Sequence, residues 1–369
     1  MTKKRVLIIS DFFIPHWTGI VTSLSYFIDR YNHVYDFSVL TINHTNCLPP
    51  YEIMNHIKIM RVPYQFSISR AKFSFFYFPQ YLSLLNRCDV VFINSPSNAI
   101  LLFAVCARLF KKRVIIFHQG DLILTQGILN RVIEKLFDFQ THLSCKVAHA
   151  LATYTQDYAS YSRILSKYKN KLHTFLFIPK KSKTPTQSLQ SLEKMRKQGF
   201  FIYGFAGRFV EEKGIDILLS AIAQVVQTNK KVHFYFAGDT PQYEKNSFFS
   251  ENNPYVTNVG LLSASDMKSF LSSLDYLIIP SRSDCFPLVQ VEALLEGTPI
   301  IASNIPGLRV PVSATKYGFL FEKENSSDLA KKILISLSER KNISRYKHAI
   351  DVLLNPLTYD SAIRTFIGK

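Results

Sequence analysis

The fold of this chain is decided by residues 281–303, SRSDCFPLVQVEALLEGTPIIAS. They follow the strand-like run 276–280, and Pro287 favours the first turn of a helix, where its missing N–H would have been unpaired anyway. Asp284 is then expected in a loop at the carboxyl edge of a parallel strand, where open α/β sheets bind ligands. The backbone N–H groups within residues 286–289, all except that of Pro287, lie at the helix N-terminus and predict an anion site beside it.

A second motif lies about 75 residues earlier, at residues 207–214, GRFVEEKG. A strand predicted over 201–206 places Arg208 at its end, and a helix predicted from 214 places Lys213 just before it. Two cations at a helix N-terminus suit a diphosphate and would stabilise a departing nucleoside diphosphate without a metal. The plainer interpretation is a surface loop with solvated charges.

Both motifs resemble those of the retaining glycosyltransferases of family 4, within the group 1 glycosyltransferases. That family has the GT-B fold, an α/β architecture of two facing Rossmann-like domains with parallel sheets and a cleft between them. The acid-x7-acid motif falls on Asp284, where the family more often has Glu, and on Glu292. The segment 207–214 resembles the phosphate motif G-R-x-x-x-x-K-G.

The resemblance implies a role for each matching residue. Asp284 would lie beside the donor sugar, Glu292 would bind the ribose, and Arg208 and Lys213 would neutralise the diphosphate. Near the donor it also implies the residues Gly207, Leu261, Phe286, Pro287, Leu288 and Gly19. His118, at the end of a predicted strand, would contact the donor sugar, and Asp121 is a candidate for orienting the acceptor. A structural histidine and ordinary strand-end packing are the alternatives.

The chain has 369 residues, 47% of them hydrophobic, which predicts two folded domains. An acceptor-binding domain is expected over 1–180, a linker over 181–199 and a donor-binding domain over 200–354. By the same resemblance, a helix over 355–369 would cross back to the N-terminal domain.

Strands and helices alternate along both halves, as in parallel βαβ sheets. The predicted strands are 4–10, 37–41, 90–94, 113–117, 149–154, 201–206, 232–237, 256–260, 276–279 and 299–302. The predicted helices are 19–30, 81–88, 98–110, 214–227, 265–272, 288–296 and 327–338.

The net charge is +17, and residues 1–180 hold 21 Lys and Arg against 9 Asp and Glu. Residues 66–81 add seven aromatic side chains to this basic half. These features favour a lipid-linked acceptor or peripheral contact with an anionic membrane, and the alternative is a buried apolar segment. The short, interrupted apolar run near the N-terminus and five scattered cysteines favour a cytoplasmic location, at the inner face of a membrane.

Several enzyme classes are disfavoured because their motifs are missing. The sequence has no Asp-x-Asp, no G-x-G-x-x-G after the first strand and no P-loop. The resemblance to family 4 implies metal-independent, retaining hexosyl transfer from a UDP- or GDP-linked sugar to a glycan or lipid-linked acceptor in cell-surface polysaccharide or glycolipid synthesis, with no cofactor. The alternatives are a non-catalytic GT-B protein, a GT-B nucleotide-sugar epimerase or phosphorylase, and a basic nucleic-acid binder.

Overall fold

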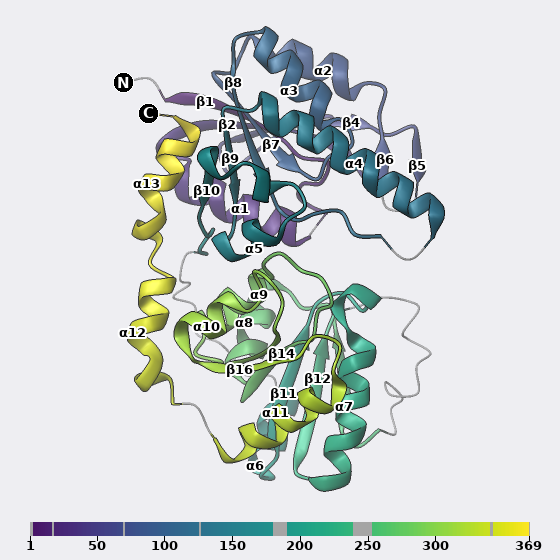
Figure 1. Ribbon diagram of the computed structural model, residues 1–369, viewed down its shortest axis with the longest axis vertical. Helices are drawn as coiled ribbons and strands as arrows, with labels where there is room; N and C mark the ends of the chain where they lie inside the picture. Colours follow the sequence, from purple (N-terminus) through teal and green to yellow (C-terminus); the bar gives the residue numbers. More distant parts are fainter. Residues whose placement is uncertain are drawn as a thin grey trace. The chain divides into compact units, whose positions relative to one another are not determined.

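The computed structural model describes residues 3–16, 18–68, 71–124, 127–179, 190–238, 253–339 and 342–368. The chain forms two compact units (Figure 1): Met1–Lys180 with Pro356–Lys369, and Lys181–Asn355. Of the predicted linker, the part up to residue 189 lies outside the described residues, and the rest includes the helix α6 (Gln190–Lys197). Each unit is an α/β structure built on a mainly parallel sheet.

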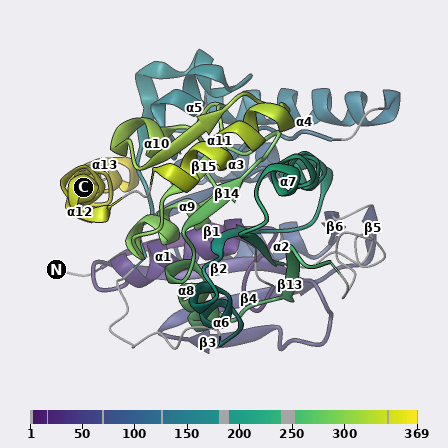
Figure 2. The ribbon, with the colours of Figure 1, turned by 90° about the horizontal axis from the view of Figure 1, so that it is seen from below.

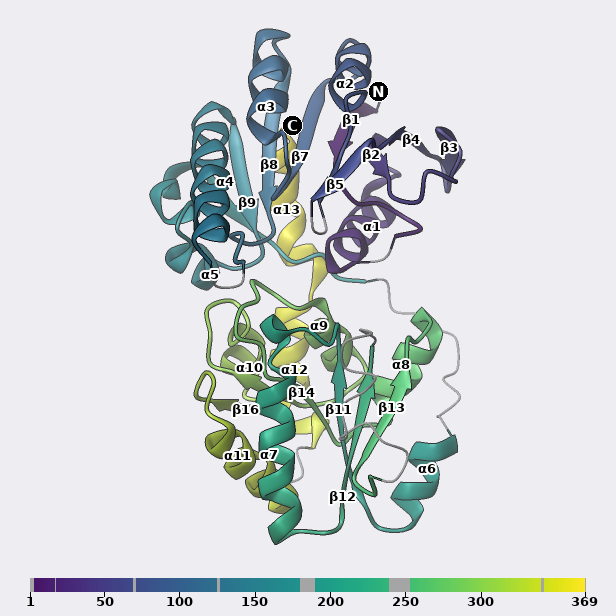
Figure 3. The same ribbon diagram turned by 90° about the vertical axis from the view of Figure 1, so that its right-hand side faces the viewer.

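Within the described residues, the first unit has an eight-stranded sheet in the order β10-β9-β8-β7-β1-β2-β4-β3 (Figure 3). Its neighbours pair in parallel, as predicted, except for the edge strand β3, which pairs antiparallel with β4. The strands are β1 (Lys4–Ile9), β2 (Tyr35–Asn43), β3 (Tyr51–Met54), β4 (Ile57–Pro63), β7 (Val90–Ser95), β8 (Arg113–His118), β9 (Ala150–Thr153) and β10 (Leu172–Thr174). The helices are α1 (Gly19–Tyr31), α2 (Tyr77–Leu85), α3 (Ile100–Leu109), α4 (Ile128–Val147), α5 (Gln156–Tyr161) and α13 (Pro356–Ile367), and β5 (Phe66–Ile68) and β6 (Ala71–Phe73) form a separate antiparallel hairpin.

The second unit has, in its described part, a six-stranded sheet in the order β13-β12-β11-β14-β15-β16, with all neighbours parallel. The strands are β11 (Phe201–Ala206), β12 (Val232–Ala237), β13 (Val256–Gly260), β14 (Tyr276–Ile279), β15 (Ile300–Ser303) and β16 (Gly318–Phe321). Besides α6, its helices are α7 (Ile215–Thr228), α8 (Ala264–Ser272), α9 (Leu288–Leu295), α10 (Val310–Thr315), α11 (Ser326–Ser338) and α12 (Ile343–Leu353).

The central strands are apolar because helices cover both faces of a parallel sheet. All six residues of β7 and of β12 are buried, for example, and their continuous apolar runs made these strands predictable. The predicted strands and helices are confirmed, with shifts of a few residues at their ends. The elements that were not predicted are β3, β4, β5, β6, β10, β16, α5, α6, α10, α12 and the 20-residue helix α4.

The strand order determines where each sheet can bind a ligand. In the second unit the order reverses between β11 and β14, and in the first unit between β1 and β7. At such a point the loops that follow two adjacent strands turn to opposite faces and leave a crevice at the carboxyl edge. The loops after β11 and β14 are 207–214 and 280–287, which hold both motifs of the sequence.

The C-terminal helix α13 packs on the first unit. Phe366 is fully buried, with its ring centroid 5.9 Å from that of Phe92 and 5.4 Å from that of Phe175. The Arg113 guanidinium donates to the carbonyl oxygen of Phe366 at 3.1 Å. The last turns of the chain therefore complete the core of the unit in which the chain begins.

The helix α3 corrects one expectation. The apolar run from Ala99 to Ala107 predicts a buried helix, yet only one face of α3 is buried, and Leu102, Val105 and Leu109 are exposed. In the described part of the chain, no helix combines the length and the apolar character needed to cross a membrane.

Candidate functional site

The loop 207–214 connects β11 to α7 and is held at both ends. At its start, the N–H of Gly207 donates to the carbonyl oxygen of Ala237 at 2.9 Å, on the neighbouring strand β12. At its end, Gly214 has a φ of 68° and precedes the first residue of α7. A Cβ at Gly214 would lie 2.1 Å from the carbonyl oxygen of Pro280, so only glycine lets this loop approach the end of β14.

This approach brings the two predicted motifs together. The ammonium of Lys213 forms an ion pair with the carboxylate of Asp284, 71 residues later in the chain. The side chains of Lys213 and Asp284 keep 23% and 14% of their surface exposed, so the pair is partly desolvated but still accessible from solvent. A cation and a carboxylate fixed at a sheet edge can together meet the phosphate and the sugar of a nucleotide sugar.

The other predicted cation, Arg208, lies more openly. Its guanidinium is 3.5 Å from the carboxylate of Glu212, and the arginine side chain is 54% exposed. An exposed ion pair of this kind contributes at most about 1 kcal/mol, so exchanging Glu212 for a phosphate costs little. A flexible arginine beside a fixed lysine suits a ligand with two phosphates.

A third cation of this edge, Arg282, was not predicted from the sequence. Its backbone N–H donates to the carbonyl oxygen of Glu212 at 2.8 Å, and its guanidinium donates to that of Glu211 at 2.8 Å. The same guanidinium binds both carboxylate oxygens of Asp216, in the first turn of α7, at 2.7 and 2.6 Å. This bidentate contact lowers the pKa of Asp216 and raises the pKa of Arg282. Arg282 therefore fastens the loop of Lys213 to the loop of Asp284, a role without a local signal because its partners lie far away in the sequence.

Helix α9 presents its N-terminus at the same edge. It begins at Leu288, with Pro287 as the capping residue, which confirms the predicted start. Phe286 and Leu288 are themselves buried. Glu292 follows Leu288 by one helical turn, on the same face, and is half-buried.

The remaining donor candidates lie at other element ends. Leu261 follows the last residue of β13 and is 79% exposed. In the first unit, Gly19 is the first residue of α1, whose capping residue Thr18 accepts the N–H of Val21 at 3.2 Å. A Cβ at Gly19 would meet no atom within 4 Å, so the main chain there is open to a ligand.

His118 ends β8 and has a partner on each ring nitrogen. Nδ1 lies 3.0 Å from the hydroxyl of Ser95, and Nε2 lies 2.9 Å from the carboxylate of Asp121. Asp121 also accepts the hydroxyl of Ser162 and the N–H of Arg163, both at 2.8 Å. Burial alone would raise the pKa of Asp121, but these hydrogen bonds and the charge of His118 lower it. In this arrangement Asp121 orients His118.

A buried carboxylate that the sequence analysis did not select, Asp11, lies where the strand order reverses in the first unit. It accepts the hydroxyl of Ser97 at 2.9 Å and the N–H of Asn98 at 3.0 Å. Burial raises the pKa of Asp11 despite these hydrogen bonds. Asp11 thereby ties the loop after β1 to the loop after β7.

The aromatic segment 66–81 divides into a buried and an exposed part. Tyr77 and Tyr81 belong to α2, and their side chains are buried in the core. Phe66 stacks on Phe73 across the β5–β6 hairpin, with ring centroids 5.0 Å apart, while Phe75 is exposed. The segment is therefore neither wholly buried nor a continuous exposed surface.

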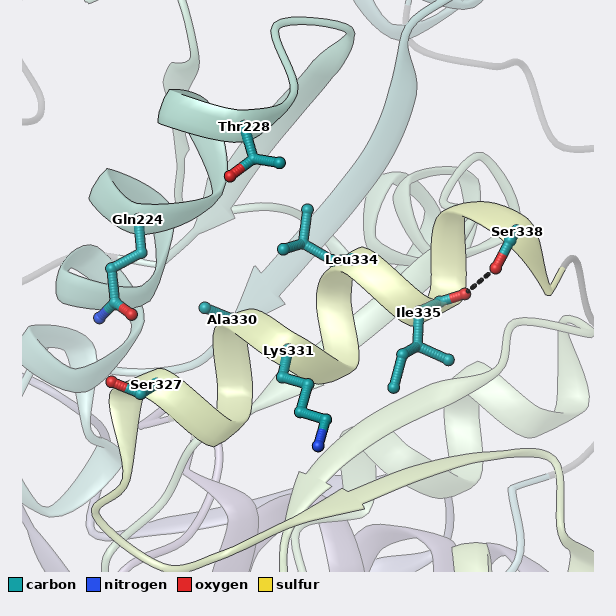
Figure 4. A pocket seen from close by; sticks show the side chains of 8 residues that line it. All are labelled: Gln224, Thr228, Ser327, Ala330, Lys331, Leu334, Ile335 and Ser338. Carbon is teal, nitrogen blue, oxygen red and sulfur yellow. Dashed lines mark hydrogen bonds between the residues drawn. The ribbon is translucent and has the colours of Figure 1, made fainter.

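An open groove of about 530 Å³ runs between α7 and α11 (Figure 4). It is lined by Gln224, Thr228, Ser327, Ala330, Lys331, Leu334, Ile335 and Ser338, and by none of the predicted site residues. Its volume therefore says nothing about the edge at which Lys213 and Asp284 meet.

Comparison with known proteins relates the second unit to a protein family. Residues 189–350 match the family model of the glycosyl transferases of group 1. An uncharacterised glycosyltransferase of Methanocaldococcus jannaschii is 35% identical over 145 residues, which is 38% of this chain and 40% of that protein. The capsular polysaccharide biosynthesis glycosyltransferase CapM of Staphylococcus aureus is 28% identical over 137 residues, 36% of each chain. The similarity thus spans less than half the length of these relatives.

A solved structure extends the likeness to the whole chain. HepE of Anabaena, determined in complex with UDP, has a TM-score of 0.72 at 16% identity and covers 99% of both chains. At this identity the comparison establishes the fold alone. The predicted GT-B class is confirmed, and residues 189–350, which include the loops of Lys213 and Asp284, match the glycosyl transferases of group 1.

Proposed function

We propose that this protein is a retaining, family 4 glycosyltransferase that moves a hexosyl group from a UDP- or GDP-linked sugar to a hydroxyl group of an acceptor. The observation that supports this most is the ion pair between Lys213 and Asp284 at the reversal of strand order, beside the N-terminus of α9. The match of residues 189–350 and the UDP complex of HepE support a nucleotide-sugar donor.

The charges suggest how the donor would bind. A diphosphate carries more negative charge than the single carboxylate of Asp284, so it would draw the ammonium of Lys213 and the exposed guanidinium of Arg208 toward itself. The N-terminus of α9 would add the positive end of its dipole. Asp284, with the backbone of residues 286–288, would then face the sugar, and Glu292 would hold the ribose.

Stabilising the departing diphosphate would drive the reaction. The acceptor hydroxyl would attack from the face that the leaving group vacates, which retains the anomeric configuration, and the leaving phosphate would take the proton. This route needs neither a metal nor a cofactor. Gly19 and His118 of the first unit remain our candidates for contacts with the donor phosphates and sugar, and Asp121 acts through His118.

The acceptor and the location are inferred from the relatives and the charge. CapM belongs to capsular polysaccharide synthesis by name, which favours a cell-surface glycan or a lipid-linked precursor. The basic first half of the chain favours a cytoplasmic protein in peripheral contact with the inner face of an anionic membrane.

A panel of UDP, GDP, ADP and their sugar conjugates in a thermal-shift assay tests the donor site. A nucleotide present at about 100 times its Kd adds about 2.7 kcal/mol of stability and so raises Tm. Glu292→Ala should abolish the shift, whereas Glu296→Ala, one turn further at the end of α9, should keep it. Arg208→Ala should lower kcat by about 100-fold, as the loss of a group that stabilises the transition state does.

The opposite outcomes are distinct. Equal nucleotide shifts in wild type, Glu292→Ala and Glu296→Ala would place the ribose elsewhere. A shift without donor hydrolysis or transfer would favour a non-catalytic nucleotide-sugar binder. Inversion of the anomeric centre, read by NMR of the product, would contradict the retaining mechanism.

A further inference from the structure

Helix α4 of the first unit turns its apolar side outward. Ile128, Val132, Leu136 and Phe139 recur at the spacing of one helix face, and with Leu129 they are between 48% and 84% exposed. The buried residues of α4 are small or polar on the opposite face: Thr141, Ser144 and Cys145. Ile133 and Phe137, on the inner side of α4, are half-buried, so the outward apolar residues stand where an ordinary surface helix has its polar face, over about three turns.

The neighbouring helix α3 extends this surface. Leu102, Val105 and Leu109 lie three and four residues apart, on one exposed face of α3. The two helices pack against each other, and Figures 1 and 3 show them side by side. In Figure 2, α4 lies at the outer edge of the first unit. We call these exposed apolar residues of α3 and α4 the α3–α4 face. So large a group of exposed apolar side chains marks a contact surface.

The charges around the α3–α4 face are positive. Arg131 and Lys135 are exposed, each three residues after an apolar member of the face, and neither pairs with an acid among the described residues. The acids of α4 are occupied inside the unit instead. Glu134 accepts the N–H of Leu124, and Asp138 binds the guanidinium of Arg163 at 2.8 Å.

We propose that the α3–α4 face docks on an anionic lipid surface. A helix that lies in a membrane interface has an apolar face bordered by Lys and Arg, whose cations meet the lipid headgroups. The charge selects this partner, because Arg131 and Lys135 border the face and residues 1–180 as a whole carry 21 cations against 9 acids, so a second copy of the chain would present like charge. This proposal rests on the membrane contact of the proposed function and assigns that contact to the α3–α4 face. Residues 66–81 are no longer the candidate for it, because their tyrosines are buried.

Vesicle flotation of the full chain tests the docking. Vesicles of phosphatidylcholine with about one third phosphatidylglycerol, a composition chosen for its negative surface potential, are compared with phosphatidylcholine alone. We expect the wild type to partition about tenfold more strongly into the anionic vesicles. The double variant Leu136→Ser/Phe139→Ser should lose about tenfold or more in partition, because both side chains leave the acyl boundary. Arg131→Gln/Lys135→Gln should lose only the preference for anionic lipid.

Matched controls separate docking from folding. Val352→Ser/Leu357→Ser removes two exposed apolar side chains on α12 and α13 and should leave flotation unchanged. Far-UV circular dichroism and Tm should be the same in all variants, since each site is exposed. A variant Phe75→Ser in the exposed part of residues 66–81 should also float like the wild type.

Three results would overturn the proposal. The first is that the wild type floats with neither kind of vesicle. The second is that the variant Leu136→Ser/Phe139→Ser floats as well as the wild type. The third is a dimer in light scattering that this variant converts to a monomer without change in flotation, because the face would then join two copies. The nucleotide thermal shift keeps the two proposals apart: docking can fail while the shift persists, and the shift can fail while flotation persists.

Discussion

At the scale of single residues, Gly214 holds the two loops of the donor edge in contact. Gly214→Ala places a Cβ 2.1 Å from the carbonyl oxygen of Pro280 at a φ of 68°. Gly260 has a φ of 70°, but a Cβ there meets no atom within 4 Å. Gly260→Ala should therefore cost about 1–2 kcal/mol of backbone strain, and Gly214→Ala about 1–3 kcal/mol more.

Urea unfolding of both variants measures the difference. Because the two backbones share their conformation, the excess loss in Gly214→Ala reports the contact with Pro280. Equal losses in the two variants would mean that the loop can move away from β14 without cost, and Lys213 would then not be held beside Asp284 by this glycine.

Gly19 offers a second test at this scale, with stability and binding expected to change in opposite directions. Alanine at the first residue of α1 fits the open space there and should raise the free energy of unfolding by up to about 1 kcal/mol. If the donor approaches the main chain at Gly19, the same methyl group weakens nucleotide-sugar binding by about tenfold, or 1.4 kcal/mol. Calorimetric titration with the donor found in the thermal-shift panel would decide, and unchanged affinity would remove Gly19 from the site.

At the scale of elements, the bidentate contact from Arg282 ties α7 to the loop after β14. The contact lowers the pKa of Asp216, so Asp216 stabilises the fold above its unfolded pKa of about 3.9, and this contribution is lost as pH falls through the lower folded pKa. Asp216 is 54% exposed, so screening keeps the contribution below about 1 kcal/mol.

Asp216→Asn should therefore be less stable than wild type at pH 6, and the difference should vanish as pH falls through the lowered folded pKa and the wild-type carboxylate becomes protonated. Unfolding curves at several pH values show this, and 1 M salt should shrink the gap at pH 6. Asp351→Asn, on the exposed side of α12, serves as the control and should match wild type throughout. A gap that is independent of pH would mean that the carboxylate charge plays no part.

At the scale of the whole molecule, the last helix belongs to the unit that the first 180 residues build. Phe366→Ala removes a fully buried ring from between Phe92 and Phe175 and should destabilise the first unit by about 3–5 kcal/mol. Leu357→Ala, on the exposed side of the same helix, should change stability little. Hydrogen exchange localises the effect, and faster exchange confined to the second unit would contradict the packing of α13.

The sequence by itself determined the two α/β halves and the main motifs. Short apolar runs such as 90–94 and 232–237 predict buried parallel strands, because a strand covered on both faces has no polar side to show. The motifs at residues 207–214 and 281–303 could also be predicted from sequence, since in each of them the loop, the start of the helix and the charged residues lie close together in the chain.

Only the tertiary structure decided which distant residues meet. Asp216 and Arg282 are 66 residues apart, and His118 and Asp121 are locked by Ser95 and Ser162 from other elements. Local sequence cannot specify such pairs, because the strand order brings them together. The outward apolar side of α4 escaped prediction for a related reason: periodicity marks an apolar face, and packing alone determines whether that face turns toward the core or toward solvent.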